Sequence, residues 1–474
     1  MPTQTRPNIL WICTDQQRYD TIRALGNPLI RTPTLDQLIA DGVAFTHAYS
    51  QSPVCTPSRA SFLTGRYPRT TRCRQNGQQL PADEVLVTRM LADVGYDCGL
   101  VGKLHLAPCQ GRPEVRGDDG YRYFQWSHHP KPDWEESDYG RWLKDQGVSW
   151  DELYGVPPGE QVGPGMPTEY HQTTWCAEKA IEFIRQPREG PWLLSVNPFD
   201  PHHPFDPPAE YLSRYDPDSM PLPAYTPGEL ANKPSFQRVD HTGAYGGRGL
   251  SFAVLDAGAQ RQIVAAYYAM VELIDDSVAR ILAAVDEAGQ RQDTLVIFMS
   301  DHGEMLGDHG IFLKGPYFYE CAVHVPLILR WPARFPAGAR IEGLVELVDL
   351  APTLLDAADH RIPLRVQGRS LLDACLQPNH AGSGREQVFC EYYNAMTGHN
   401  RAAHGTMIRT PTHKICVYHG RDEGELYDLQ SDPGETRNLW DEPEHVALKL
   451  DLLKRCFDAS VFTMDPSPPR QAAF

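Results

Sequence analysis

The chain has 474 residues, of which 41% are hydrophobic and 22% are charged, as in a globular protein with one large core and a smaller domain attached. Its formal net charge of −17 disfavours general binding to nucleic acid or to an anionic membrane, because the summed field repels polyanions. No apolar stretch reaches the roughly 18 residues that a membrane helix needs.

The start of the chain lacks the basic segment, apolar run and small-residue cleavage site of a secretory signal. The eleven cysteines are an odd number and contain no Cys-x-x-Cys pair, which is typical of buried thiols in a reducing compartment. We therefore expect a cytoplasmic protein without nucleic-acid or membrane partners. Its oligomeric state stays open, a homo-oligomer included.

Short apolar runs alternate with longer amphipathic segments over most of the chain. Strand-like runs lie at residues 8–14, 98–102, 192–196, 294–300 and 325–331. Apolar residues at three- and four-residue spacing predict helices at residues 34–41, 173–185, 259–288 and 348–358. This alternation predicts an α/β fold, with a large, mostly parallel or mixed sheet sandwiched by helices.

The pattern changes after about residue 372. Four short strand-like runs follow, at residues 388–392, 406–409, 414–418 and 425–429, and then a helix near residues 446–456. They predict a small antiparallel sheet with one helix. We expect two domains, residues 1–372 and 373–474.

Polar side chains follow several predicted strands directly. They are Asp15 and Gln16, then Lys103 and His105, then Asp200 and His202, and finally Asp301 and His302. Because ligands of open α/β sheets bind beyond the carboxyl ends of the strands, we expect these residues to meet at one edge and to form an active site.

The segment of residues 52–66, SPVCTPSRASFLTGR, carries the candidate nucleophile. Pro57 suits the first turn of a helix, so Cys55 lies at or just before a helix N-terminus, where an anion is favoured. A lone cysteine is usually a packing residue. Here, however, Cys55, Pro57, Ser58, Arg59 and residues 63–66 resemble the sulfatase signature Cys-x-Pro-Ser-Arg followed by Leu-Thr-Gly-Arg.

This resemblance implies an alkaline-phosphatase-like fold and hydrolysis of sulfate esters, with a small molecule or a saccharide as the alcohol part. In that family a maturation enzyme oxidises the cysteine to formylglycine, an aldehyde that hydrates to a diol. One hydroxyl attacks sulfur, and the second expels sulfate as the aldehyde forms again. The resemblance thus makes Cys55 the precursor of formylglycine and the maturation enzyme a partner of this chain.

Four residues are the candidate ligands, with the modified Cys55, of one divalent metal ion: Asp15, Gln16, Asp301 and His302. The alternative for Asp15 and Asp301 is that they cap the following helices. The family usually has two adjacent aspartates where this chain has Asp15 and Gln16, and Gln16 with His302 resembles the phosphonate monoester hydrolases, close relatives of sulfatases. We expect Ca²⁺, with Mn²⁺, favoured by the softer His302, or Mg²⁺ as alternatives.

The family pattern also implies a set of cationic and proton-transferring side chains. Arg59 would hold the diol and the oxygens on the metal side, and Lys103 and His105 would flank the nucleophile. His105 could accept the diol proton that drives sulfate release. Taken singly, such lysines and histidines are usually surface or packing residues, and the interpretation depends on the whole set.

Four further residues complete the candidate pocket. His202 matches the family's His-x-Pro position, and His203 is its neighbour. Lys314 matches the lysine that contacts sulfate and helps to protonate the leaving group. Asn76 and His203 are candidates for substrate binding.

Two alternatives stay open. Gln16 favours a phosphonate monoester hydrolase or phosphodiesterase of the same superfamily, although those enzymes carry other residues in place of Lys103 and His105, whereas sulfatases keep them. The other alternative is a non-catalytic protein that binds sulfated glycans, against which the complete set of reactive residues argues. Residues 425–439 resemble the sulfatase terminal signature, and the loops at residues 111–165 and 206–249 carry no readable specificity code.

Overall fold

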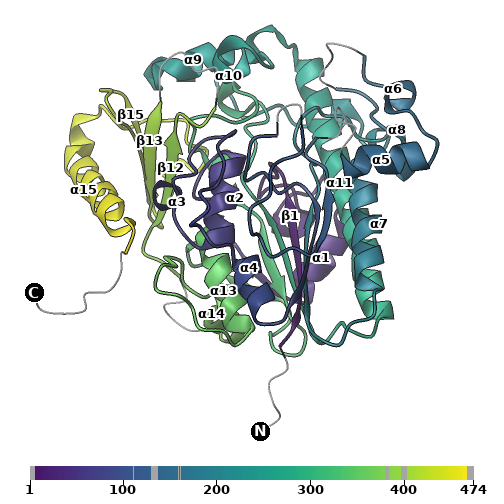
Figure 1. Ribbon diagram of the computed structural model, residues 1–474. Coiled ribbons are helices and arrows are strands. Elements are labelled where there is room, and N and C mark those ends of the chain that lie inside the picture. Colours follow the sequence, from purple (N-terminus) through teal and green to yellow (C-terminus); the bar gives the residue numbers. More distant parts are fainter. Residues whose placement is uncertain are drawn as a thin grey trace, which may run out of the picture.

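The computed structural model describes residues 6–109, 112–129, 137–157, 160, 162–378, 384–396 and 403–466. Within them, a large sheet has the strand order β10-β2-β9-β7-β1-β6-β4-β5 (Figure 1). Every neighbouring pair is parallel except the two that involve β9, which is antiparallel to β7 and β2. The strands are β1 (Asn8–Thr14), β2 (Val43–Phe45), β4 (Asp97–Gly102), β5 (Tyr123–Trp126), β6 (Trp192–Asn197), β7 (Thr294–Ser300), β9 (Leu327–Arg330) and β10 (Ala339–Ile341).

Successive side chains of each strand enter two different cores, which explains why the strands read as continuous apolar runs. Ile9 and Trp11 of β1 belong to one core, and Leu10 and Ile12 belong to the other. The first core is covered by α2 (Cys55–Thr64), α4 (Val87–Asp93), α13 (Leu350–Ala357) and α14 (Leu372–Leu376). The second is covered by α1 (Pro33–Ala40), α5 (Asp138–Asp145), α7 (Gln172–Ile184) and α11 (Ala257–Glu287), so the sheet is sandwiched by helices as predicted (Figure 1).

Shorter elements lie in the connections. A small sheet has the order β11-β3-β8, with β3 (Ala48–Tyr49), β8 (His324–Val325) and β11 (Val345–Glu346). The short helices are α3 (Pro68–Thr71), α6 (Trp150–Leu153), α8 (Ala209–Leu212), α9 (Ser235–His241), α10 (Ala244–Gly247) and α12 (Glu320–Val323). Turns of 3-10 helix occur at Arg23–Leu25, Thr168–Tyr170, Pro217–Ser219, Glu229–Asn232, Phe252–Val254, Asp308–Gly310, Leu347–Asp349 and Pro443–His445.

The small C-terminal sheet is confirmed. Its antiparallel order is β12 (Val388–Tyr393), β13 (His404–Arg409), β14 (His413–Tyr418) and β15 (Gly424–Asp428). One face packs against α15 (Val446–Phe462) through Ile408 and Ile415, and the other packs against the main body through Met407 and Cys416 (Figure 1). The helix is longer than the predicted residues 446–456.

One predicted strand was wrong as a single element. Residues 325–331 divide at Pro326 into β8, which pairs with β3, and β9, which pairs with β7 and β2. A proline has no backbone N–H to donate to a sheet, and here the chain passes between two sheets at this residue. The domain boundary at residues 372 and 373 stays a prediction.

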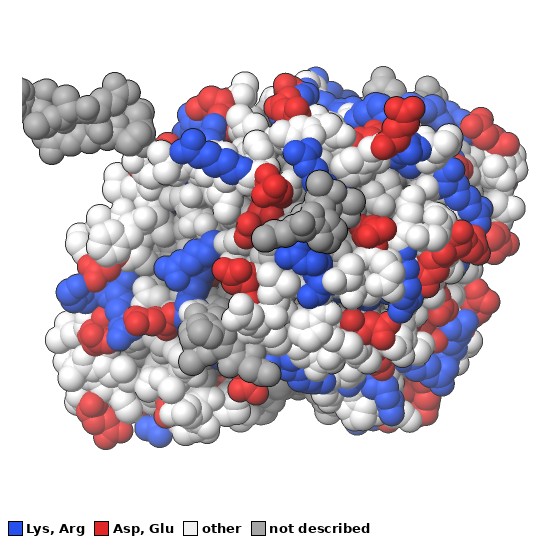
Figure 2. Space-filling model, turned by 90° about the horizontal axis from the view of Figure 1, so that it is seen from below, with Lys and Arg blue, Asp and Glu red and all other residues white. Residues whose placement is uncertain are grey.

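No helix in the described part of the chain is long and apolar enough to cross a membrane. On the face seen in Figure 2, acidic and basic side chains are interleaved and do not gather into a patch of one sign.

Candidate active site

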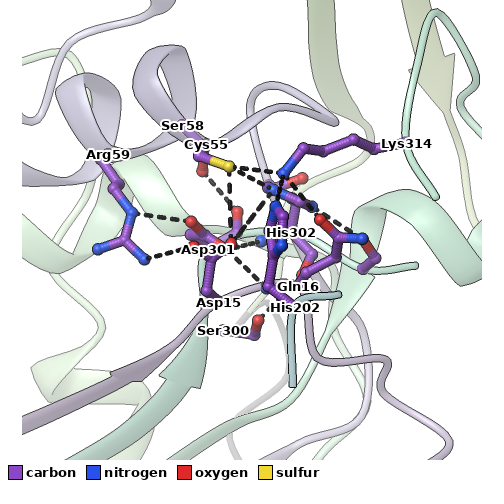
Figure 3. A network of polar contacts seen from close by, with 12 residues as sticks. Asp15, Gln16, Cys55, Ser58, Arg59, His202, Ser300, Asp301, His302 and Lys314 are labelled. Atoms are coloured by element: carbon purple, nitrogen blue, oxygen red, sulfur yellow. Dashed lines mark hydrogen bonds and ion pairs between the residues drawn. The ribbon is translucent and has the colours of Figure 1, made fainter. Parts of the chain in front are cut away.

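Side chains from three separate segments converge on one point beyond the carboxyl ends of the central strands (Figure 3). Asp15 and Gln16 follow β1, Asp301 and His302 follow β7, and Cys55 opens α2. One donor atom from each of Asp15, Cys55, Asp301 and His302 lies within 4.8 Å of the other three, and all four residues are buried. The structure therefore brings the predicted strand-end residues Asp15, Asp301 and His302 together, with Cys55 of α2 beside them.

Asp200, which follows β6, was wrongly expected at the same point. Its side chain belongs to a separate buried cluster with His171 and Asp206, and the His171 Nδ1 to Asp200 Oδ2 distance is 3.7 Å. His202, two residues further on, does reach the site, because its Nε2 lies 2.8 Å from Lys314 Nζ.

The local sequence places Cys55 at the first position of α2. Gly65 ends this helix in the left-handed region, with φ at 69°, and a Cβ there would lie 2.8 Å from Val366 Cγ1. This close approach explains the glycine of the signature motif. Every residue of α2 is buried, so the helix end that presents Cys55 is held rigidly in the core.

The Cys55 sulfur is surrounded by charged and polar groups. Its Sγ lies 2.9 Å from Lys314 Nζ, 3.1 Å from His302 Nε2 and 3.6 Å from Asp15 Oδ1. Burial and the Asp15 carboxylate act to raise the pKa of this thiol, but Lys103, Lys314 and His302 outweigh them and bring the pKa below its ordinary value. An anionic or strongly polarised group is thus favoured at this position.

Two cations hold the carboxylates of the cluster. Arg59 Nε donates to Asp301 Oδ2 at 2.8 Å, and Lys103 Nζ forms an ion pair with Asp15 Oδ2. Burial acts against the Asp15 carboxylate, but Lys103 and the other nearby cations hold its pKa well below its usual range. Asp15 is therefore an anion, as a metal ligand must be.

Arg59 also has one hydrogen-bond donor that no described residue accepts. Its Nη1 donates to the backbone oxygen of Lys103 at 2.9 Å, whereas the buried Nη2 has no hydrogen-bond acceptor among the described residues and lies 3.9 Å from Asp15 Oδ2. A buried donor without an acceptor is costly, and an oxyanion next to Cys55 would satisfy it.

Gln16 is oriented from both ends of its amide. Its Oε1 accepts from Lys314 Nζ at 2.7 Å, and its Nε2 donates to Glu304 Oε2. The oxygen therefore points toward the site, where it can act as a metal ligand. Two carboxylates, one amide oxygen and the His302 imidazole fit a single divalent cation of the hard or borderline class.

The alternative that Asp15 and Asp301 cap helices is wrong. The segments after β1 and β7 are loops, in which the next helical turns begin at Arg23 and Asp308. Instead, Asp301 Oδ1 accepts from the backbone N–H groups of Gln16 and His302, at 3.0 and 2.9 Å.

The remaining predicted residues surround this centre and make different contacts. Asn76 Oδ1 accepts from the backbone N–H of Thr56 at 3.0 Å, so it anchors the start of α2. The His203 ring stacks on that of His202, with centroids 4.1 Å apart. No hydrogen bond joins His105 to Cys55 among the described residues, and burial and Lys103 hold the pKa of His105 well below its ordinary value.

Two residues of the network escaped the sequence-based prediction. Ser58 Oγ donates to the backbone oxygen of Asp301 at 2.6 Å and ties α2 to the end of β7. Glu304 receives the Gln16 amide and the backbone N–H groups of Leu306 and Leu313. Ser58 belongs to the nucleophile segment, and Glu304 follows Asp301 by three residues.

Comparisons with known proteins agree with this geometry. A family model described as Sulfatase matches residues 7–360, and one described as N-sulphoglucosamine sulphohydrolase, C-terminal, matches residues 307–460. The chain is 31% identical to the multifunctional alkaline phosphatase superfamily protein PehA of Trinickia caryophylli, over 95% of this chain and 94% of that protein. It is 29% identical to an arylsulfatase of Clostridium perfringens, over 95% and 93%.

Among solved structures, the phosphonate monoester hydrolase of Agrobacterium radiobacter superimposes with a TM-score of 0.84 at 27% identity, over 97% of this chain and 96% of that one. The alkaline-phosphatase-like fold expected from the sequence is thereby confirmed.

Proposed function

The chain belongs to the sulfatase family, and we propose that it is an arylsulfatase-type enzyme that hydrolyses sulfate esters through a formylglycine made from Cys55. The observation that carries this proposal is the position of the Cys55 sulfur, at the first residue of α2 and within 3.6 Å of Asp15, His302 and Lys314. A nucleophile in this place has the metal-binding side chains of Asp15 and His302 on one side and the Lys314 ammonium group on the other.

Maturation would convert the Cys55 side chain to an aldehyde: the maturation enzyme would supply the two-electron oxidant, the aldehyde oxygen would come from outside the chain, and the sulfur would leave as sulfide. Addition of water then gives a diol at the place that the sulfur now occupies. The family implies a divalent metal, which Asp15, Gln16, Asp301 and His302 would hold. When bound, this ion would supply positive charge to the sulfate oxygens and to the attacking hydroxyl. We propose Ca²⁺, because oxygen donors predominate.

The side chains around the diol divide the work of the reaction. Arg59 Nη2 is available to a sulfate oxygen, since the described residues offer it no acceptor. Lys314 Nζ, which contacts both the Cys55 sulfur and His202 Nε2, is placed to donate a proton to the leaving oxygen when the S–O bond of the ester breaks.

Release of sulfate needs a base. The second hydroxyl of the diol loses its proton, the aldehyde C=O bond forms, and the bond from carbon to the sulfate oxygen breaks. His105 is proposed as the acceptor of this proton. Burial and Lys103 keep its pKa low, so the imidazole is neutral and has a lone pair to offer.

A phosphonate monoester hydrolase or phosphodiesterase is the second candidate. Gln16 favours it, because an amide in place of a second aspartate removes one negative charge from the metal, and the likeness to a phosphonate monoester hydrolase structure agrees. Lys103 and His105 favour the sulfatase.

Steady-state kinetics on mature protein separate the candidates. We expect kcat/KM to be highest for 4-nitrophenyl sulfate, lower for a phenylphosphonate monoester and lower again for a phosphate diester, and Cys55→Ala to abolish all three. A dominant phosphonate activity would replace the proposal by the second candidate. Protein that bound sulfated sugars but released no sulfate would establish the non-catalytic alternative.

A further inference from the structure

A second group of metal-binding side chains lies beside the active site. His105 and Cys109 follow β4, and His128 follows β5, its parallel neighbour in the sheet. One donor atom from each of the three lies within 4.8 Å of the other two. We propose that His105, Cys109 and His128 bind a soft divalent cation such as Zn²⁺, separately from the Asp15 cluster, and that this ion reversibly inhibits the enzyme.

The geometry is close to that of a bound ion. In tetrahedral zinc sites the donor atoms lie about 3.3–3.6 Å apart, so donor atoms that lie within 4.8 Å of one another need to approach by at most about 1.5 Å. The rings of His105 and His128 already meet edge to face, with centroids 4.4 Å apart. Small side-chain rotations are enough to close the site, and water or substrate can supply a fourth ligand.

His105 has a ring nitrogen that makes no hydrogen bond to the described residues. Its Nδ1 is buried and has no hydrogen-bond partner among the described residues. An unmade hydrogen bond at a buried polar atom is costly, and a bond from this nitrogen to a metal would offset that cost. The backbone of His105 is fixed in the left-handed region, with φ at 61°, because Glu114 accepts its N–H and that of Leu106, each at 2.8 Å.

The donor set selects a metal class different from that of the Asp15 cluster. Burial holds the pKa values of His105 and His128 well below that of free histidine, so both imidazoles are neutral. Cys109 is one of two cysteines that are not fully buried among those described, the other being Cys321. Two nitrogens and one sulfur favour Zn²⁺ over Ca²⁺ and Mg²⁺.

Charges around the cluster act in both directions. Lys103 and Arg59 oppose a further cation, as they oppose protonation of His105. On binding, the Cys109 thiol releases its proton to solvent as the metal–sulfur bond forms, so the site gains one negative charge. The buried Glu114 carboxyl group, which also accepts from Trp126 Nε1 at 2.9 Å, lies next to His105.

The inhibition follows because His105 would serve both as a ligand of this ion and as the base that accepts the diol proton. This step depends on the proposed function. A metal bond would hold the imidazole ring away from the diol and occupy one of its nitrogens. Sulfate release would then lack its base, although Asp15, Asp301 and His302 would keep their own ion.

Cobalt absorption tests the site independently of any activity, because Co²⁺ substitutes for Zn²⁺ and gives a sulfur-to-metal band only with a thiolate ligand. Cys55→Ala protein serves as the background, since this change removes the thiol that lies with Asp15, Asp301 and His302 in the other group of metal-binding side chains. We expect this protein to show the band, the Cys55→Ala/Cys109→Ser double variant to lose it, and the matched Cys55→Ala/Cys321→Ser variant to keep it. Absence of the band in Cys55→Ala, or its persistence without Cys109, would overturn the proposal.

Activity of mature protein tests the regulatory step. Zn²⁺ added at constant Ca²⁺ should inhibit the wild-type enzyme, and Cys109→Ser should raise the half-inhibiting Zn²⁺ concentration at least tenfold without changing the rate in its absence. Equal inhibition of both proteins would refute the inhibitory role. If the mature protein hydrolyses no sulfate ester, the proposed function fails, whereas the cobalt spectra still decide the metal site.

Discussion

Glu304 controls which end of the Gln16 amide faces the metal-binding residues Asp15, Asp301 and His302. Glu304 Oε1 accepts from the backbone N–H groups of Leu306 and Leu313, and Oε2 accepts from Gln16 Nε2. In Glu304→Gln, the new amide oxygen keeps both backbone bonds, so its NH2 group faces the NH2 group of Gln16. Two donors then oppose each other.

The strain is relieved if the Gln16 amide turns over. Its nitrogen would then face Lys314 Nζ, which now donates to Gln16 Oε1 at 2.7 Å, and the metal would lose an oxygen ligand. Loss of such an outer partner typically costs 10–100-fold in metal affinity, or about 1.4–2.7 kcal/mol.

The assay is the metal concentration that half-restores activity to chelator-treated mature enzyme. We expect Glu304→Gln to raise it 10–100-fold and to recover much of the rate at saturating metal. Glu435→Gln is the matched control, because Glu435 is also buried and accepts a backbone N–H, that of Glu320 at 2.6 Å, but lies outside the site. An unchanged metal requirement in Glu304→Gln, or an equal rise in the control, would refute this reasoning.

Three further measurements test Arg59, the metal site and the separate buried cluster around Asp200. Arg59→Lys should lower kcat/KM at least about 100-fold in a steady-state assay, because the single nitrogen of a lysine cannot reach the three separate positions that Nε, Nη1 and Nη2 of Arg59 occupy; near-normal kcat/KM would contradict this. Chelation should inactivate the enzyme, and Ca²⁺ should restore more activity than Mn²⁺ or Mg²⁺; full activity of protein shown by elemental analysis to be free of metal would contradict the metal site. Burial raises the pKa of Asp200 to about 7, above its unfolded value, so the folded state holds the extra proton and the free energy of unfolding should fall by up to about 4 kcal/mol as pH rises from about 4 to 7. In urea unfolding, Asp200→Asn should therefore gain stability over the wild type at pH 8 relative to pH 5, and parallel pH curves for the two proteins would contradict it.

The central sheet could be predicted because its strands are buried on both faces. β1 and β7 coincide with the predicted residues, since each reads as an unbroken apolar run closed by a polar residue. The edge strands β5 and β10, and β2 next to β10, were missed, because they have only three or four residues and no such run. Their pairing depends on neighbours that are distant in sequence.

The site could be predicted where one chemical motif stood at one strand end. Asp15 and Asp301 meet for that reason, and the signature motif places Cys55 beside them at the start of α2. The direction of a side chain could not be predicted in the same way. Asp200 follows a strand too, but its carboxylate turns toward Thr173, whose Oγ1 donates to Oδ2 at 2.7 Å. Glu304 was missed because it orients the Gln16 side chain and is not itself a candidate metal ligand.

Peptide mass spectrometry at Cys55, made in parallel with an active-site titration, tests the central claim most directly. Conversion to the aldehyde exchanges one sulfur and two hydrogens for one oxygen, a loss of about 18 Da, whereas ordinary thiol oxidation adds mass. We predict that the fraction of chains with this loss equals the fraction that turns over 4-nitrophenyl sulfate. Full sulfatase activity in protein whose Cys55 is still an intact thiol would contradict the account.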